Sequence, residues 1–198
     1  MDTRNHILQT ALALFLQRGF RDVTMKEMVE SSGLSKGAFY HYFDSKEKVF
    51  EEGVRAFFNA FQIENYDALS ATSLQAFYRN WAERIGKPAR LATIVGQDDF
   101  NFEVNHYYLI FDALRLLPDF KAEFSQQQDH ELAAWIKIIQ VAQRTGEIKS
   151  DISPQCLAKL FISTADGVIL HLLIQKGLSK VQSEVLKLWD AIYALVKT

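Results

Sequence analysis

The chain has 198 residues, which is enough for one or two domains with a sizeable buried core. It carries 22 Lys and Arg against 24 Asp and Glu, with 48% hydrophobic and 23% charged residues, which excludes intrinsic disorder. The single cysteine, Cys156, excludes an internal disulfide framework and favours a reducing cytoplasm. No secretion signal and no apolar run of about 18 residues occurs, so we expect neither export nor membrane insertion.

The first expected helix covers residues 3–18, where apolar side chains recur at helical spacing. Arg18-Gly19-Phe20 ends this segment. Gly19 suits the left-handed position after a helix, and Phe20 is then expected to pack back on Phe15.

Two short helices follow within the first 43 residues. Thr24 and Glu27 have the spacing of a capping box, which opens a helix that ends before Gly33. Ser35 is placed to cap the next helix. Asp44 and Glu47 repeat the box spacing at the head of a longer helix. Helices this short and this closely joined predict a small separate unit.

The remainder of the chain predicts longer helices and no strands. We expect helices at about 70–85, 102–116, 119–145, 153–176 and 180–197, with a weak short one near 88–95. Pro88, Pro118 and Pro154 all stand where a helix would begin, a position that tolerates proline. The fold class is therefore all-α, with about nine to ten helices in total.

Residues 24–43 contain the most informative pattern, a helix-turn-helix. Gly33 supplies the sharp turn, while the second helix presents Lys36, Tyr40 and His41 on one small outward face. A recognition helix places such N-terminal donors against base edges in the major groove. The alternative is that the aromatic side chains are only core of a solvated bundle, and we favour it for Phe39 and Phe43.

Each outward residue has a chemical reason to contact DNA. The start of the second helix can hold a phosphate on its free N–H groups, and Gly37 lets the DNA backbone approach closely. Lysine, tyrosine and histidine can donate to phosphates or guanine and can touch thymine methyl groups. Residues at the starts of the neighbouring helices could contact the DNA backbone on either side of the recognition helix. The predicted DNA-binding residues are Thr24, Ser35, Lys36, Gly37, Tyr40, His41, Tyr42 and Lys46.

This N-terminal third resembles the DNA-binding domain of the tetracycline-repressor (TetR) family of transcriptional regulators. The similarity lies in Arg18-Gly19-Phe20, in Thr24, and in the run from Gly33 to Phe43 followed by Ser45-Lys46-Glu47. Alanine is usual in the family where this chain has Val29 and Ser32. The resemblance implies a homodimer that binds operator DNA, usually as a repressor, and a divergent C-terminal domain that binds a small effector. It divides the chain into a DNA-binding domain at 1–50 and a helical effector-binding and dimerisation domain at 51–198.

The last two expected helices are candidates for the dimer interface. The segment 153–176 is apolar on two faces and therefore needs two partners. Reading two DNA half-sites also requires two subunits. The alternative is that both faces belong to the core of one subunit. The predicted interface residues are Phe161, Ala165, Val168, Leu172, Val185, Trp189 and Ile192.

The middle of the chain is rich in aromatic residues and could form an effector pocket. Tyrosine and tryptophan bury a ring while they offer a polar tip, which suits a largely apolar ligand with a few polar contacts. Most such residues are plain core, so this prediction is the weaker one. The candidate pocket residues are Phe77, Trp81, Asn105, His106, Tyr107, Tyr108, Phe111 and Trp135.

Catalytic and metal-binding patterns are missing from the sequence. The five histidines show no paired ligand spacing, and no glycine-rich phosphate loop or nucleophile elbow occurs. We therefore expect no enzyme, no cofactor and no metal. The leading hypothesis is a cytoplasmic, ligand-responsive DNA-binding regulator. A helical small-molecule-binding or adaptor protein that no longer binds DNA is the second.

Overall fold

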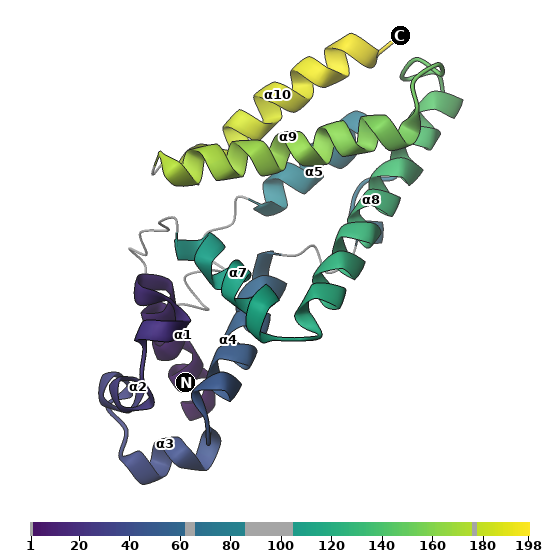
Figure 1. Ribbon diagram of the computed structural model, residues 1–198. Helices are drawn as coiled ribbons and strands as arrows, with labels where there is room; N and C mark the ends of the chain where they lie inside the picture. The colour runs from purple at the N-terminus through teal and green to yellow at the C-terminus, as the bar shows by residue number, and fades with distance from the viewer. Residues whose placement is uncertain (1, 62–65, 86–104, 176–177) are drawn as a thin grey trace. The chain divides into compact units, whose positions relative to one another are not determined.

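The computed structural model describes residues 2–61, 66–85, 105–175 and 178–198. Over these ranges the regular structure is helical, apart from one isolated bridge between Ile148 and Lys197. The α-helices are α1 (Thr3–Asp22), α2 (Met25–Ser32), α3 (Lys36–Tyr42), α4 (Lys46–Phe61), α5 (Leu74–Ile85), α7 (Asn105–Leu116), α8 (Phe120–Arg144), α9 (Pro154–Ile174) and α10 (Val181–Val196), with short 3-10 helices η1 (Tyr66–Ala68) and η2 (Leu178–Lys180) (Figure 1).

The all-α fold class is confirmed. The long predicted helices agree with α5, α7, α8, α9 and α10 to within a few residues at their described ends. The short helix expected near 88–95 lies outside the described residues.

The chain forms two compact units. The first unit comprises residues 1–62 and 88–121, and the second comprises 63–87 and 122–198. The expected boundary between residues 50 and 51 falls inside α4. The functional division at that boundary stays a prediction.

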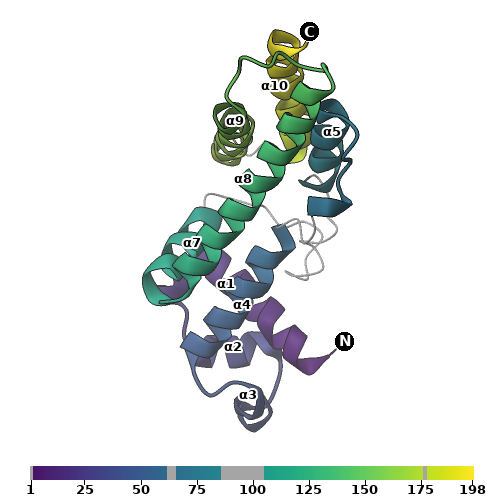
Figure 2. The ribbon, with the colours of Figure 1, turned by 90° about the vertical axis from the view of Figure 1, so that its right-hand side faces the viewer.

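Aromatic rings hold the first unit together. Phe15 of α1 makes an edge contact with Phe50 of α4 at 5.2 Å, and Phe20 packs within 6.0 Å of Phe15 and 4.7 Å of Phe50. The expected contact between Phe20 and Phe15 is thus confirmed. On α7, the Asp112 carboxylate accepts the N–H of Phe20 at 3.3 Å. Both views place α3 at one end of this unit (Figures 1 and 2).

The end of α1 differs in detail from the expected cap. Gly19 has φ +77° and ψ 167°, so its φ is positive as predicted but its ψ is extended instead of left-handed helical. The helical path breaks here and resumes as a further turn that includes Phe20. Side chains other than glycine rarely adopt this φ, which explains why glycine stands at this position.

Three tryptophans form the centre of the second unit. Trp135 of α8 stacks on Phe161 of α9 at 4.9 Å, and Trp189 of α10 lies 5.1 Å from Trp135 and 5.0 Å from Trp81 of α5. The indole N–H of Trp189 donates to the Phe161 carbonyl at 2.8 Å. α10 packs against both α5 and α9.

The Glu147 carboxylate joins α5 to α10 in the second unit. Glu147 accepts hydrogen bonds from the N–H groups of Leu74 and Gln75 at 2.9 and 3.2 Å. Both lie in the first turn of α5, where N–H groups have no partner within the helix. Glu147 also accepts a hydrogen bond from the Tyr193 hydroxyl at 3.2 Å.

Among the helices whose residues the structure describes, none combines the length and apolar character needed to cross a membrane.

Candidate nucleic-acid interface

Helix α2 begins with the capping box that its sequence predicts. The Thr24 hydroxyl accepts the Glu27 N–H at 3.2 Å, and the Glu27 carboxylate accepts the Thr24 N–H at 2.8 Å. Arg18 donates to the other carboxylate oxygen of Glu27 at 2.8 Å. This Arg18 bond, followed by the bonds from Thr24, lowers the pKa of Glu27 from 4.5 to about 2. The carboxylate therefore stays ionised and ties α2 to α1.

The turn between α2 and α3 also depends on local hydrogen bonds. Gly33 has φ +67° and ψ +10°, the left-handed conformation that ends a helix, and its N–H donates to the Glu30 carbonyl at 3.2 Å. Ser35 then caps α3, since its hydroxyl accepts the Ala38 N–H at 3.2 Å. The head of α4 differs from expectation by one residue. Ser45 instead of Asp44 accepts the Lys48 N–H there, at 3.4 Å.

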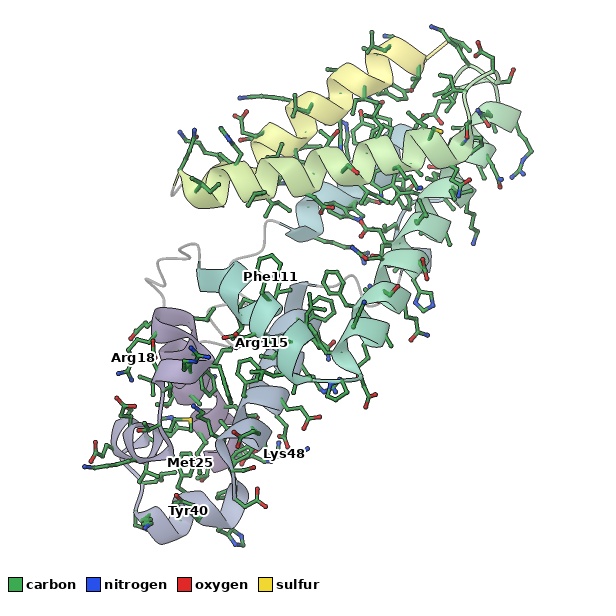
Figure 3. The ribbon with its side chains drawn as sticks, viewed as in Figure 1. Arg18, Met25, Tyr40, Lys48, Phe111 and Arg115 are labelled. Carbon is green, nitrogen blue, oxygen red and sulfur yellow. The ribbon has the colours of Figure 1, made fainter. Side chains whose placement is uncertain are left out.

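Helix α3 buries one face and exposes the other. Phe39 is fully buried, and Phe43 just beyond the helix is 1% exposed, so both belong to the core as expected. Tyr40 and Tyr42 are 41% and 38% exposed, and Figure 3 labels Tyr40 on this helix. The ammonium group of Lys36 lies 5.7 Å from the Tyr40 ring centroid. The structure thus brings together the exposed residues Ser35, Lys36, Gly37, Tyr40, His41 and Tyr42, with the exposed Thr24 at the head of α2.

Helix α1 secures this exposed helix through contacts with the chain just before and just after α3. The His6 ring Nε2–H donates to the Ser32 carbonyl at 2.9 Å, at the last residue of α2. The Arg4 guanidinium lies 5.1 Å from the Phe43 ring centroid and forms an ion pair with Glu52 of α4. These contacts fix the orientation of α3 within the first unit.

Lys46 has a different environment from the other predicted DNA-binding residues. Its ammonium group donates to the carbonyl oxygens of Phe20 and Val23 at 2.8 and 2.7 Å, with the Arg21 carbonyl at 3.4 Å. It also lies 4.2 Å from the Phe20 ring centroid. All three donors of the ammonium are engaged at the end of α1. A phosphate contact by Lys46 stays a prediction. It requires the ammonium group to exchange one of these hydrogen bonds for a bond to phosphate.

The N-terminal residues match a known family. Residues 7–52 match the family described as bacterial regulatory proteins, tetR family. The HTH-type transcriptional repressor NemR of Escherichia coli is 50% identical over 46 residues, which is 23% of each chain. The HTH-type transcriptional repressor KstR2 of Rhodococcus jostii is 26% identical over 167 residues, covering 82% of this chain and 76% of the relative.

Residues 7–52 of the chain are thus a DNA-binding region of the tetR family type. The protein is a DNA-binding transcriptional regulator and not an enzyme. Solved structures agree on the fold: a TetR transcriptional regulator from Chloroflexus aurantiacus superposes with a TM-score of 0.67 at 19% identity, covering 98% of this chain and 96% of that one.

The predicted dimer residues of this chain lie mostly in the core of their own subunit. The fully or nearly buried ones are Phe161, Ala165, Leu172, Val185 and Trp189, whereas Val168 and Ile192 are half-buried. Five of the seven are already buried within one subunit, and a role for these residues in a dimer interface stays a prediction. The outward face of the same helices exposes Leu160, Leu170, Ile174, Leu188 and Leu195.

The predicted pocket residues fall into both units. Phe77, Trp81 and Trp135 lie in the second unit, where the Phe77 and Trp135 ring centroids are 5.0 Å apart. Phe111 belongs to the first unit and is 61% exposed. The other four, Asn105, His106, Tyr107 and Tyr108, form the first turn of α7, and their side chains lie outside the described residues.

The structure adds two acidic residues that the sequence pattern missed. Glu131 of α8 and Asp166 of α9 both belong to the second unit, and the charge of Asp166 acts on Glu131. Each could have been noticed from spacing, because Glu131 precedes Trp135 by one helical turn and Asp166 follows Ala165 in an apolar helix. Spacing along one helix could not show that they approach each other.

Proposed function

We propose that this protein is a homodimeric repressor that binds operator DNA through α3 and is released when a small effector binds the second unit. The observation that carries this proposal is the exposed face of α3. Its donors and rings face outward, while Phe39 and the caps Thr24 and Ser35 fix the helix behind them. Such an arrangement suits insertion of a short helix into the major groove.

In this proposal Lys36, Tyr40 and His41 contact bases or phosphates, and Ser35, Gly37 and Tyr42 follow the DNA backbone. The supporting facts are their exposure and their position in the first turns of α3. The modest charge of the N-terminal part, with seven Lys and Arg against six Asp and Glu in residues 1–50, limits phosphate contacts per subunit. Tight binding therefore requires two subunits.

The experiment is a gel-shift titration with an operator fragment selected by the protein from a random double-stranded library. Lys36→Ala and Tyr40→Ala should each weaken binding by roughly tenfold or more, as expected for loss of a base contact. Lys121→Ala, which removes an exposed lysine at the start of α8, is the matched control. If no fragment is selected, or if binding is independent of salt, the protein is the adaptor of the second hypothesis.

The dimer interface that we propose is the outward face of α9 and α10. Of the nine large hydrophobic residues that are exposed in the described part of the chain, five lie on these two helices. Together with small residues that permit close helix approach, they recur at intervals of three or four residues. An added Cβ at Gly167 would meet nothing within 4 Å in a single subunit. The proposed stripes are Leu160, Ser163, Gly167, Leu170 and Ile174 on α9, and Leu188, Ala191 and Leu195 on α10.

Charge on these stripes should separate the subunits. Leu170→Glu combined with Leu188→Glu is expected to give a monomer in light scattering and to abolish tight operator binding. Leu116→Glu, at an exposed leucine of α7, should leave the dimer intact. If the double variant remains dimeric, the dimer interface lies on another surface and the proposal is wrong.

The effector in this proposal is largely apolar and binds among α5, α8 and α9, where Phe77, Trp81 and Trp135 meet. It acts by preferring the conformation with weaker DNA affinity, with a coupling of about 1–3 kcal/mol. A regulator of bacterial genes works beside the chromosome, so we place the protein in the cytoplasm.

A further inference from the structure

Helix α7 contacts the end of α1 through the carboxylate of Asp112. α7 belongs to the same compact unit as α1 to α4 and packs against both α1 and α4. Its residues Leu109 and Ala113 are buried, and Asp112 follows Leu109 by three residues, which puts it on the same face of the helix. The Asp112 Oδ2 atom accepts the Phe20 N–H at 3.3 Å, across 92 positions of the chain.

The Phe20 N–H needs an acceptor because of the backbone at Gly19. The ψ angle of Gly19 is 167°, so the helical path of α1 breaks there before it resumes. A helical turn that begins after such a break has N–H groups without partners inside the helix. A half-buried N–H group that lacks an acceptor destabilises the folded protein. Asp112 therefore supplies a cap from a distant part of the sequence.

The same short segment anchors the helices on both sides of α3. Lys46, at the start of α4, donates to the Phe20 carbonyl at 2.8 Å. Arg18 donates at 2.8 Å to the carboxylate of Glu27, which forms the capping box of α2. α2 precedes α3 and α4 follows it. Residues 18–23 therefore connect α7 to the two helices that hold the recognition helix.

We infer that Asp112 is a positioning residue for DNA binding: from α7 it fixes the end of α1 and, through it, the starts of α2 and α4. This inference rests on the proposed function, because it assigns a support for the operator-binding face of α3 that lies outside the DNA-binding domain expected at residues 1–50. Asp112 acts through the Phe20 peptide and not on DNA, since its negative charge would repel phosphates.

A local role for Asp112 as the partner of Arg115 explains the contacts less well. Arg115, labelled in Figure 3, donates to the Oδ1 atom at 2.8 Å, but its own side chain is 58% exposed. Exposed ion pairs of this kind contribute little to stability. The Oδ2 atom has the separate task of accepting the Phe20 N–H. Because the two oxygen atoms have different partners, different variants can remove each interaction.

Variants of α7 separate the two interactions. Asp112→Ala removes both. Asp112→Asn removes the charge but keeps an oxygen atom that can accept the Phe20 N–H, and Arg115→Gln removes the ion pair but leaves Asp112 in place. Asp112→Leu resembles the aspartate side chain in shape but has no acceptor, and it replaces the alanine variant if that one does not fold.

The first measurement is operator affinity by gel shift, at a temperature where circular dichroism shows each variant to be folded. Asp112→Ala should weaken binding by roughly tenfold, although the loss of a negative charge alone would strengthen binding to phosphates. Asp112→Asn and Arg115→Gln should stay within about threefold of the unmodified protein. The salt dependence of binding should keep its slope in Asp112→Ala, whereas a lost phosphate contact would lower it.

The second measurement needs no DNA. Hydrogen–deuterium exchange of the full-length protein, read by mass spectrometry, should become faster in Asp112→Ala at the starts of α2 and α4 and stay unchanged in α9. The start of α2 is the decisive segment, because α2 packs against α1 and the bonds of Asp112 go to Phe20 and Arg115. Faster exchange confined to α7 and the end of α1 would indicate a local role only.

Three results would overturn the inference: Asp112→Ala binds the operator as tightly as the unmodified protein, Asp112→Asn binds as weakly as Asp112→Ala, or exchange at the start of α2 is unchanged. Failure of the proposed function has a different signature. If the unmodified protein selects no operator, the repressor proposal is wrong, and the exchange measurement still decides whether Asp112 supports α2 and α4. If the operator binds and Asp112→Ala changes neither measurement, the proposed function stands and the inference is wrong.

Discussion

The helix-turn-helix and the aromatic core around Trp81 and Trp135 treat their polar groups in opposite ways. In the first, Thr24, Glu27 and Ser35 find partners within three residues along the chain. In the second, the buried indole N–H groups of Trp81 and Trp135 close no hydrogen bond within the described residues, and burial raises the pKa of Glu131. Local satisfaction gives a rigid surface that can be presented to DNA. Incomplete satisfaction makes the stability of the second unit depend on its packing and on pH, and the predictions below probe this difference.

The largest expected effect comes from the phenylalanine core of the first unit. Phe15→Ala removes a ring that packs on Phe20 and Phe50, and should lower the free energy of unfolding by about 3–5 kcal/mol. Urea unfolding followed by circular dichroism should reveal this loss. Tryptophan fluorescence reports the second unit alone, so its transition should shift less. Equal shifts in both signals would show that the two units unfold together.

The next effect concerns the pH dependence of stability. Because the pKa of Glu131 is raised above 4.5 to about 7, the folded protein binds an extra proton between these values. The contribution of this group to stability is greatest below pH 4.5 and is lost as pH rises through 7. Glu131→Gln should therefore raise the free energy of unfolding at pH 8 by about 2 kcal/mol and by much less at pH 5. Urea titrations at both values measure this, and Asp129→Asn should change neither.

Lys46 tests whether its three carbonyl contacts stabilise the end of α1. Lys46→Met keeps the length of the side chain but removes the donors, and should cost about 1–3 kcal/mol in free energy of unfolding. The matched control is Lys48→Met, which breaks only half-exposed ion pairs with Glu51 and Glu52 and should cost less than about 0.5 kcal/mol. Similar losses in the two variants, measured by urea unfolding, would contradict a special role for Lys46.

The smallest expected effect is at the cap of α3. Ser35→Ala removes the acceptor for the Ala38 N–H and should cost about 1 kcal/mol in stability. Operator affinity should fall as well, since the same residue begins the exposed face. Ser31→Ala, on the exposed side of α2, is the control in both the unfolding and gel-shift assays. An unchanged unfolding transition for Ser35→Ala would argue against this cap.

Most of the N-terminal architecture could be predicted because its determinants are close in sequence. A capping box spans four residues, and a glycine turn depends mainly on its own backbone preference. The small errors arose where neighbours compete. Ser45 caps α4 in place of Asp44, and Gly19 ends the helical path with an extended ψ.

Helical periodicity was less informative about the second unit. It showed that α9 has two apolar faces, but the burial of Phe161 and Trp189 and the exposure of Leu170 depend on which helices pack beside α9. The expected pocket likewise combined Trp81 with Phe111, which belongs to the other unit. Both features involve residues distant in sequence, and one sequence does not specify those distances.

The sequence by itself determined the all-α fold and the capped helix-turn-helix, because these follow from short-range hydrogen bonds and periodicity, while the family was indicated by resemblance of the motif residues. Only the tertiary structure decided that Lys46 donates to the end of α1, which face of α9 points outward, and that burial raises the pKa of Glu131. The physical reason is that burial, and with it the pKa of a carboxyl group, is a property of the packed helices.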